Sequence, residues 1–264
     1  MEDRVVVERR GPVALVELNR ADKLNALDTA MFRAIIAAGE ELRKAAGLRA
    51  VVLAGRGRAF CAGLDVAAFG ALAADLDTFL APYRGGPQNV AQEVAHVWTR
   101  LPVPVIAAVQ GPCFGGGLQI ALGADIRLVH AEAELSVMEV VWGLIPDMIG
   151  TTRLRDLVRL DVAKELTFTG RRVKGEEAVR LGLATRVEED PRAAALALAD
   201  EIAGRSPDAV RAAKKLLDAA VRVDEATGLA MEAEAQRALI GSKNQLEAVM
   251  AKMQKRKPAF VDPQ

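Results

Sequence analysis

The sequence is poor in aromatic residues and cysteine, and each scarcity narrows what the protein can be. Phe, Trp and Tyr make up 4% of the 264 residues, although hydrophobic residues make up 51%. The interior must therefore be built mainly from Ala, Val, Leu and Ile. The chain has two cysteines, too few for a disulfide framework, which suits a reducing cytoplasm. Cys61 and Cys113 are expected to be buried packing residues.

Histidine is also scarce. His96 and His130 are the two present, and no G-x-S-x-G motif accompanies them, which argues against a serine hydrolase with a catalytic histidine. No His, Cys, Asp or Glu residues follow the spacing of a metal site, so no metal is predicted. Carboxylates are left as the acid and base groups.

The sequence also has no excess of charge of either sign and no long apolar run. Lys plus Arg and Asp plus Glu both number 35, so no overall field favours nucleic acid or an anionic membrane. No apolar run reaches the ~18 residues that a membrane helix needs, and the first residues do not resemble a secretory signal. We expect a cytoplasmic protein without a nucleic-acid partner or a membrane span.

Two glycine-punctuated turns, each after an apolar run typical of a buried strand, are the most informative features present. The run at 50–55 leads into AGLD at 62–65, and the run at 103–109 leads into GGG at 115–117. Glycine lets a ligand approach the main chain closely, and residues that open a helix leave N–H groups unpaired. If the turns converge, they supply two donors for one developing oxyanion, which indicates carbonyl chemistry.

Each turn has simpler explanations when taken alone. A single glycine-rich turn after a strand is usually just a tight connection. Neither turn is a phosphate-binding loop, because the second lacks the Lys-Ser/Thr of a P-loop and the spacing of a dinucleotide site.

The organisation of the chain changes near residue 191. Strand-like and helical patterns alternate before it, which predicts an α/β domain over 1–191. From residue 192 the pattern is helical, with amphipathic helices predicted over 192–205, 208–221, 223–240 and 245–256. Four such helices cannot all bury their apolar faces on a small core, so 192–264 is predicted to contact other subunits.

Two carboxylates are candidates for proton transfer. Glu139 lies in the mostly apolar stretch 137–142, where desolvation would raise its pKa toward neutrality. Asp147 follows Pro146 in a glycine-bounded loop. The simpler alternatives are an ion-paired or solvated Glu139 and a turn-forming or helix-capping Asp147.

An ordered set of short motifs runs along nearly the whole chain: LNR at 18–20, LNAL at 24–27, FCAGLD at 60–65, PVIAAV at 104–109, GGG at 115–117, ADIR at 124–127, GLIP at 143–146, TGR at 169–171 and AVRLGLA at 178–184. Together these motifs resemble the enoyl-CoA hydratase/isomerase (crotonase) superfamily. The resemblance implies an α/β fold, a spiral of ββα units with a helical C-terminal trimerisation region. It also implies an acyl-CoA substrate, with CoA as part of the substrate and no separate cofactor, and a homotrimer or homohexamer.

The resemblance assigns roles to particular residues. The N–H groups of Leu64 and Gly116 would form the oxyanion hole for the thioester oxygen. Six residues match the CoA-binding wall of the family: Lys23, Leu24, Ala26, Ala62, Asp65 and Val66. A basic cluster on the last helix could reach CoA phosphates or could be an ordinary solvated helix end; it consists of Lys252, Lys255, Arg256 and Lys257.

The acid–base residues separate the activities within this family. Hydratases carry two glutamates; here the second is Glu139, but the first position is Gln119, which cannot take a proton from water. Dienoyl-CoA isomerases carry a Glu followed eight residues later by an Asp, as Glu139 and Asp147 do, although they also have an Asp at the position of Gln119. We therefore predict double-bond isomerisation in an unsaturated acyl-CoA. Hydration of a 2-enoyl-CoA, with Gln119 orienting the water, and non-catalytic acyl-CoA binding remain as alternatives.

Overall fold

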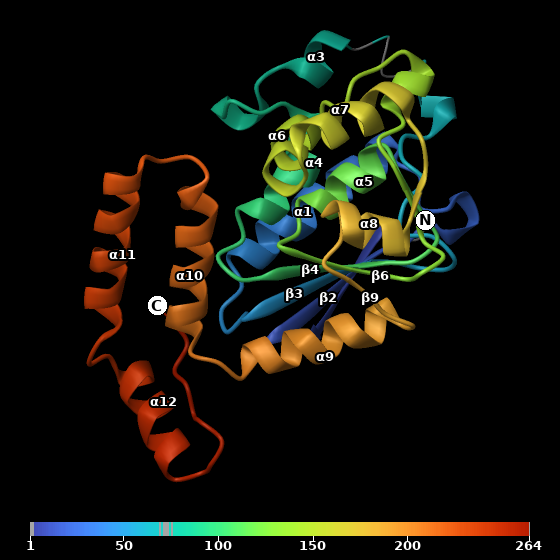
Figure 1. Ribbon diagram of the computed structural model, residues 1–264. Coiled ribbons are helices and arrows are strands. Elements are labelled where there is room, and N and C mark those ends of the chain that lie inside the picture. The colour runs from blue at the N-terminus through green and yellow to red at the C-terminus, as the bar shows by residue number, and fades with distance from the viewer. Residues whose placement is uncertain (1–2, 69, 71–73, 75, 264) are drawn as a thin grey trace.

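The computed structural model describes residues 3–68, 70, 74 and 76–263. At its centre is a six-stranded sheet with the strand order β1-β2-β3-β4-β6-β9 (Figure 1). These strands are β1 (Val5–Arg10), β2 (Val13–Leu18), β3 (Ala50–Gly55), β4 (Val105–Val109), β6 (Ile126–Val129) and β9 (Arg186–Val187). The first two form an antiparallel hairpin, and every later pairing is parallel.

The central strands β3 and β4 are apolar throughout because helices cover both faces of the sheet. Alternate residues of a strand point to opposite faces. Val51 and Leu53 accordingly pack in one hydrophobic cluster, whereas Ala50, Val52 and Ala54 pack in another. The first face carries α1 (Thr29–Arg43), α4 (Val90–Thr99) and α5 (Gly116–Leu122), and the second carries α9 (Pro191–Ala203) (Figure 1).

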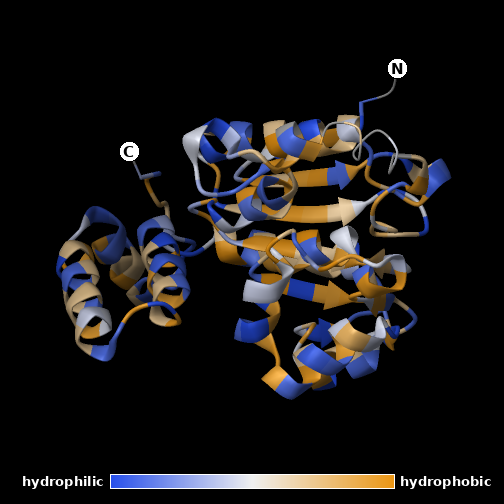
Figure 2. Cartoon of the chain, turned by 90° about the horizontal axis from the view of Figure 1, so that it is seen from above, coloured by the Kyte–Doolittle hydropathy of each residue, from blue (hydrophilic) through white to orange (hydrophobic). Residues whose placement is uncertain are grey.

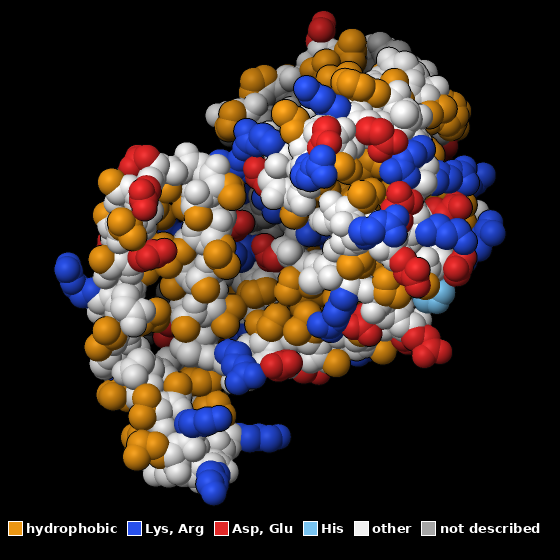
Figure 3. All heavy atoms as spheres, viewed as in Figure 1, with side chains coloured by type: hydrophobic (Ala, Val, Ile, Leu, Met, Phe, Trp, Pro, Cys, Tyr) orange, Lys and Arg blue, Asp and Glu red, His pale blue; other side chains and the backbone are white. Residues whose placement is uncertain are grey.

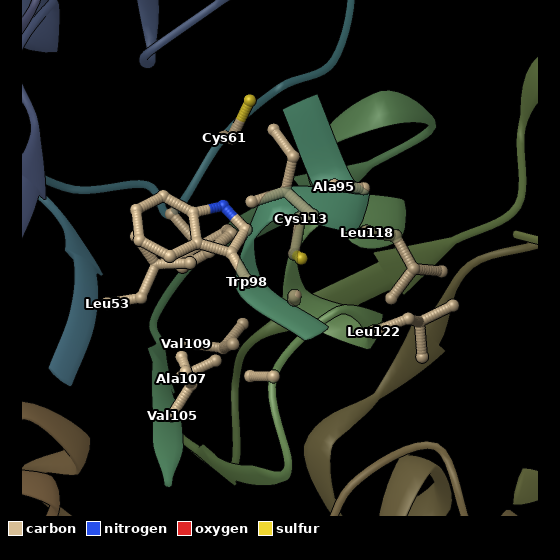
Figure 4. Packing of buried hydrophobic residues seen from close by; sticks show 14 of the residues in the cluster. Leu53, Cys61, Ala95, Trp98, Val105, Ala107, Val109, Cys113, Leu118 and Leu122 are labelled. Atoms are coloured by element: carbon tan, nitrogen blue, oxygen red, sulfur yellow. The ribbon is translucent and has the colours of Figure 1, made fainter. Parts of the chain in front are cut away.

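The larger hydrophobic cluster consists mainly of Ala, Val, Leu and Ile side chains. Among its aromatic members is Trp98 of α4, which is fully buried beside Leu53 and Val109 (Figure 4). Cys61 and Cys113 are free and fully buried, as predicted, and burial raises the pKa of the Cys61 thiol to about 12. Both thiols therefore serve as packing groups in the neutral form.

A second, three-stranded sheet lies beside the glycine turns. It has the order β5-β7-β8, formed by β5 (Pro112–Phe114), β7 (Glu134–Ser136) and β8 (Val173–Lys174). The remaining elements before α9 are short: η1 (Ala21–Lys23), η2 (Val66–Ala68), α3 (Leu76–Leu80), η3 (Tyr83–Gly85), η4 (Glu139–Trp142), α6 (Gly150–Leu157), α7 (Leu160–Thr169) and α8 (Gly175–Leu181).

The helical C-terminal segment divides into two parts. Helix α9 packs on the sheet, where Ala195, Ala199 and Ala203 face the cluster formed by β2, β3 and β4. By contrast, α10 (Pro207–Ala220), α11 (Glu225–Leu239) and α12 (Lys243–Met253) extend to one side of the core (Figures 1 and 2). The four helices predicted after residue 192 are present; the domain division at that residue stays a prediction.

Helices α10–α12 carry exposed apolar side chains (Figure 3). Leu217 of α10 is 72% exposed and Met253 of α12 is 79% exposed. Within the part of the chain that the structure describes, no helix combines the length and apolarity needed to cross a membrane.

Candidate active site

The two glycine turns run side by side, so the condition stated in the sequence analysis is met. Cys61 and Cys113 pair in a parallel β-bridge, with the Cys61 amide donating to the Pro112 carbonyl at 3.1 Å and the Phe114 amide donating to the Cys61 carbonyl at 3.0 Å. A Cβ on Gly117 would lie 2.3 Å from the Cys61 carbonyl oxygen. The chains can approach this closely because Gly117 has no side chain.

Each turn presents an unpaired amide to the same hollow. Gly116 is the first residue of α5, after Gly115 with φ of 50°. Among the described residues, neither the Leu64 amide nor the Gly116 amide donates a hydrogen bond. Both residues line a cavity of about 110 Å³. Its walls are Ala62, Gly63, Leu64, Val66, Gly115, Gly116, Met138, Glu139, Trp142 and Leu144.

Glu139 is buried in the wall of this cavity, at the first position of η4. Its Oε1 accepts a hydrogen bond of 2.6 Å from the Gln119 Nε2, whereas its Oε2 has no hydrogen-bond partner among the described residues. Burial raises the pKa of Glu139. A hydrogen bond from its own backbone amide and the hydrogen bond from Gln119 act against this rise, and the negative charge of Asp147 adds to it. A carboxyl group with a raised pKa suits proton exchange near neutral pH.

Gln119 connects Glu139 to the loop that carries Asp147. The side chain extends from α5 and is 2% exposed. Its Oε1 accepts hydrogen bonds from the Met148 amide at 2.7 Å and from the Gly150 amide at 2.9 Å. A Cβ on Gly150 would lie 2.5 Å from this oxygen, so the loop reaches Gln119 through a residue without a side chain.

Asp147 is electrostatically coupled to Glu139 and does not cap the helix that follows. Helix α6 begins at Gly150, whose amide donates to the Gln119 Oε1, and Ile149 at the N-cap position makes no side-chain capping hydrogen bond. The helix-capping alternative for Asp147 is therefore wrong. Although much of the Asp147 surface is exposed, desolvation by the surrounding protein raises the pKa of its carboxyl group.

The six residues predicted to contact CoA lie on two segments that hydrogen-bond to each other. The Ala62 amide donates to the Leu24 carbonyl at 2.9 Å, and the Asp65 amide donates to the Leu27 carbonyl at 2.9 Å. Leu24, Ala26, Ala62 and Asp65 are partly exposed, and Lys23 and Val66 are exposed. The structure therefore brings the predicted set together beside the Leu64 amide.

Two polar residues that the sequence analysis did not assign to the site hold these segments in place. Arg20 forms an ion pair of 2.7 Å with Asp65 and donates to the Ala26 carbonyl at 3.1 Å. The Arg20 hydrogen bond lowers the pKa of Asp65. Asn25 is fully buried and donates to the Ala59 carbonyl at 2.9 Å and to the Phe60 carbonyl at 3.2 Å. Arg20 lies in the LNR motif and Asn25 in the LNAL motif, but both contact the segment 59–65, which is distant in the sequence.

The basic cluster at residues 252–257 is not brought to this site within one chain. It lies at the end of α12, away from α5 (Figures 1 and 2). Arg256, which follows the end of α12, donates a hydrogen bond of 2.8 Å to Glu247 of that helix.

Leu64 and Gly116, whose amides donate no hydrogen bond among the described residues, line a cavity together with Glu139. Asp147 is not one of the residues described as lining this cavity, but its negative charge acts on Glu139. This arrangement suits carbonyl chemistry with proton transfer. The sequence pattern of the enoyl-CoA hydratase/isomerase family matches residues 8–263. The chain belongs to this family and is an acyl-CoA enzyme with the crotonase-like α/β fold predicted above.

Known relatives match the chain over almost its full length. It is 33% identical over 258 residues to a short-chain-enoyl-CoA hydratase of Clostridium acetobutylicum, covering 97% of this chain and 96% of that protein. It is also 33% identical over 261 residues to the mitochondrial methylglutaconyl-CoA hydratase of Mus musculus, covering 96% and 80%. The crystal structure of an enoyl-CoA hydratase from Bacillus anthracis superimposes with a TM-score of 0.88 at 31% identity, covering 97% and 98%.

Proposed function

We propose that the protein moves a double bond in an unsaturated acyl-CoA. The thioester oxygen binds between the Leu64 and Gly116 amides; neither amide donates a hydrogen bond among the described residues, and both residues line the same cavity. Donors fixed in this way stabilise the negative charge that develops on the oxygen when a proton leaves C2.

Glu139 carries the proton in this scheme. With a 3-enoyl-CoA, the Glu139 carboxylate takes a proton from C2, and the bonding electrons delocalise onto the thioester oxygen as a dienolate. The electrons then return to form the C2–C3 double bond, while C4 takes the proton back from Glu139. The substrate neither gains nor loses atoms.

Asp147 extends the reach of the reaction to a 3,5-dienoyl-CoA. Glu139 again takes the C2 proton, but the trienolate is protonated at C6 by Asp147, which gives the 2,4-dienoyl-CoA. Asp147 must hold a proton for this step, and its raised pKa favours that form. Proton transfer between the two carboxyl groups through solvent restores the starting state.

One observation carries this proposal: the side chain at position 119 cannot act as a base. An amide has no basic group, and the Gln119 carbonyl already accepts two backbone N–H groups. Glu139 and Asp147, which both have raised pKa values, are then the groups left to exchange protons.

Hydration of a 2-enoyl-CoA is the second candidate, because the relatives described above carry hydratase names. In that reaction Glu139 would take a proton from water as the oxygen adds to C3, and the protonated Glu139 would return a proton to C2. Gln119 would contribute its second N–H to the water.

Incubation with 2-enoyl-, 3-enoyl- and 3,5-dienoyl-CoA, with products resolved by chromatography, tests the proposal. Isomerised products from the 3-enoyl and dienoyl substrates are expected. Efficient hydration of the 2-enoyl substrate without migration in the others would show the hydratase alternative to be right. Tight binding without turnover of any substrate would instead indicate a non-catalytic acyl-CoA-binding protein.

We also propose that α10–α12 mediate assembly into a homotrimer or homohexamer. The exposed apolar side chains of these helices, among them Leu217, Leu229 and Met253, support this proposal, because a surface of this kind is stabilised when it is buried against another subunit. Light scattering at micromolar concentration should give a trimeric or hexameric mass, and a monomer would refute the proposal.

A further inference from the structure

We propose that Gln119 is a positioning residue that holds Glu139 and the Asp147 loop in one arrangement, so that the Oε2 atom of Glu139 carries the proton. The inference rests on the proposed function in that Glu139 is taken as the proton carrier. It does not depend on whether the product is an isomer or a hydrate.

The Gln119 amide is almost fully occupied by protein. A glutamine side chain can donate two hydrogen bonds and accept two. Here Oε1 accepts from the Met148 and Gly150 amides, and Nε2 donates to Glu139. Because the side chain is 2% exposed, turning it toward a water would leave two buried backbone N–H groups without an acceptor, which is costly.

The hydrogen bond to Glu139 distinguishes the two oxygens of its carboxyl group. Oε1 lies 2.6 Å from the Gln119 Nε2, and an O–H at Oε1 would compete with this N–H donor. Oε2 is buried and has no hydrogen-bond partner among the described residues. When Glu139 is protonated, its O–H is therefore expected at Oε2.

The same amide holds the loop on the other side of Glu139. Met148 and Gly150 flank Ile149, whose φ of 64° is unfavourable for a branched residue. Asp147 directly precedes Met148, so two hydrogen bonds to one oxygen fix the backbone on which the Asp147 carboxyl group is placed. A glutamate at position 119 could still accept both N–H groups, but it could not donate to Glu139 and would add a like charge beside it.

These contacts predict an order of Glu139 pKa values that is independent of turnover. Gln119→Leu removes the donor that stabilises the ionised form, so the Glu139 pKa should rise. Gln119→Glu removes the donor and adds a negative charge, so the upper apparent pKa of the pair should be higher still. The Glu139 pKa is therefore expected to be lowest in the wild type, higher in Gln119→Leu and highest in Gln119→Glu.

The pKa values can be measured by ¹³C NMR of the full chain labelled at the glutamate side-chain carboxyl carbon. The Glu139 resonance is assigned by its loss in Glu139→Gln. The expected order supports the inference. An unchanged Glu139 pKa in both variants would overturn it, and measuring two variants keeps the test decisive if Gln119→Leu does not fold.

Kinetics provide the second readout. Gln119→Leu should lower kcat roughly ten- to a hundredfold, the effect of losing a hydrogen bond to a charged group, with little change in KM. The acidic limb of the pH profile should move to higher pH in step with the NMR pKa. Gln92→Leu is the control. Gln92 accepts a hydrogen bond of 2.9 Å from the Asn89 amide at the start of α4, and its replacement should change neither kcat nor the Glu139 pKa.

The two proposals fail in different ways. If the pKa order holds while the enzyme only hydrates 2-enoyl-CoA, the role of Gln119 stands and the isomerase proposal is wrong. If isomerisation is found while substitutions of Gln119 leave the Glu139 pKa unchanged, the positioning role is wrong and the proposed function stands.

Discussion

The two halves of the candidate site are built by different means. The glycine turns offer backbone donors, and their geometry follows from the absence of side chains at Gly63, Gly115 and Gly117. The acid–base half consists of side chains, Glu139 and Asp147, placed by contacts with a third side chain, Gln119. A substitution should therefore damage the first half when it adds atoms and the second when it changes the chemical group.

The largest effect on the backbone half is expected from Gly117→Ala. The new Cβ would lie 2.3 Å from the Cys61 carbonyl oxygen, so the turns must separate. We expect destabilisation of about 3 kcal/mol, the upper range for overpacking a core, together with loss of activity. Thermal unfolding measures this effect.

Gly228→Ala is the matched control for that substitution. Gly228 lies within α11, and the nearest atom to an added Cβ is 4.0 Å away. Because alanine favours the helix by about 1 kcal/mol over glycine, this variant should be slightly more stable and fully active. Equal unfolding temperatures for the two variants would contradict the close approach of the turns.

The largest effect on the acid–base half is expected from Glu139→Gln. The amide can still accept the Gln119 hydrogen bond but cannot exchange protons, so kcat should fall at least ~10²-fold. Calorimetric binding of an acyl-CoA should change little, because the substitution leaves the proposed thioester donors, the Leu64 and Gly116 amides, in place. Full activity on every substrate would mean that the site is misplaced.

Asp147→Asn should separate the proposed role of Asp147 from that of Glu139. Loss of the second proton donor should abolish migration from a 3,5-dienoyl- to a 2,4-dienoyl-CoA, yet spare the one-carbon shift of a 3-enoyl-CoA. Product analysis by ultraviolet absorbance separates the two reactions. Intact dienoyl isomerisation would make Asp147 an ordinary turn residue.

The pH dependence of the free energy of unfolding should show how much the burial of Glu139 destabilises the folded state. Its pKa is raised in the folded protein, so the folded state is relatively destabilised as pH rises through the unfolded and then the folded pKa. Glu139→Gln removes this cost and should raise the unfolding temperature at neutral pH, with the gain fading toward low pH. A gain that is the same at all pH values would point to packing instead.

The smallest effect on catalysis is expected from Leu64→Ala. The proposed donor is the Leu64 backbone amide, so kcat should stay within about threefold of the wild-type value, which is less than the tenfold change that corresponds to ~1.4 kcal/mol. The half-buried side chain packs on the core, and its truncation should cost about 1 kcal/mol of stability. A hundredfold drop in kcat with normal stability would show that the side chain itself takes part.

Local patterns in the sequence were sufficient for much of the fold, whereas the roles of the site residues remain predictions. Continuous apolar runs predicted the buried strands β3 and β4, and helical periodicity predicted α9–α12. Glycines predicted the two turns because a backbone without a Cβ is a local property, and the fold showed that the turns converge. Glu139 was recognisable because a carboxylate in an apolar stretch is costly unless it has a partner or a function.

The tertiary structure decided which of these groups meet. α9 packs on the sheet, although its amphipathic pattern resembles those of α10–α12, because the pattern does not specify what an apolar face is buried against. Arg20 pairs with Asp65, and Gln119 bonds to residues 20, 29 and 31 positions away. Hydrogen bonds over such separations depend on the fold of the intervening chain. The sequence by itself therefore determined the chemical groups and the local backbone geometry, and the fold determined their partners.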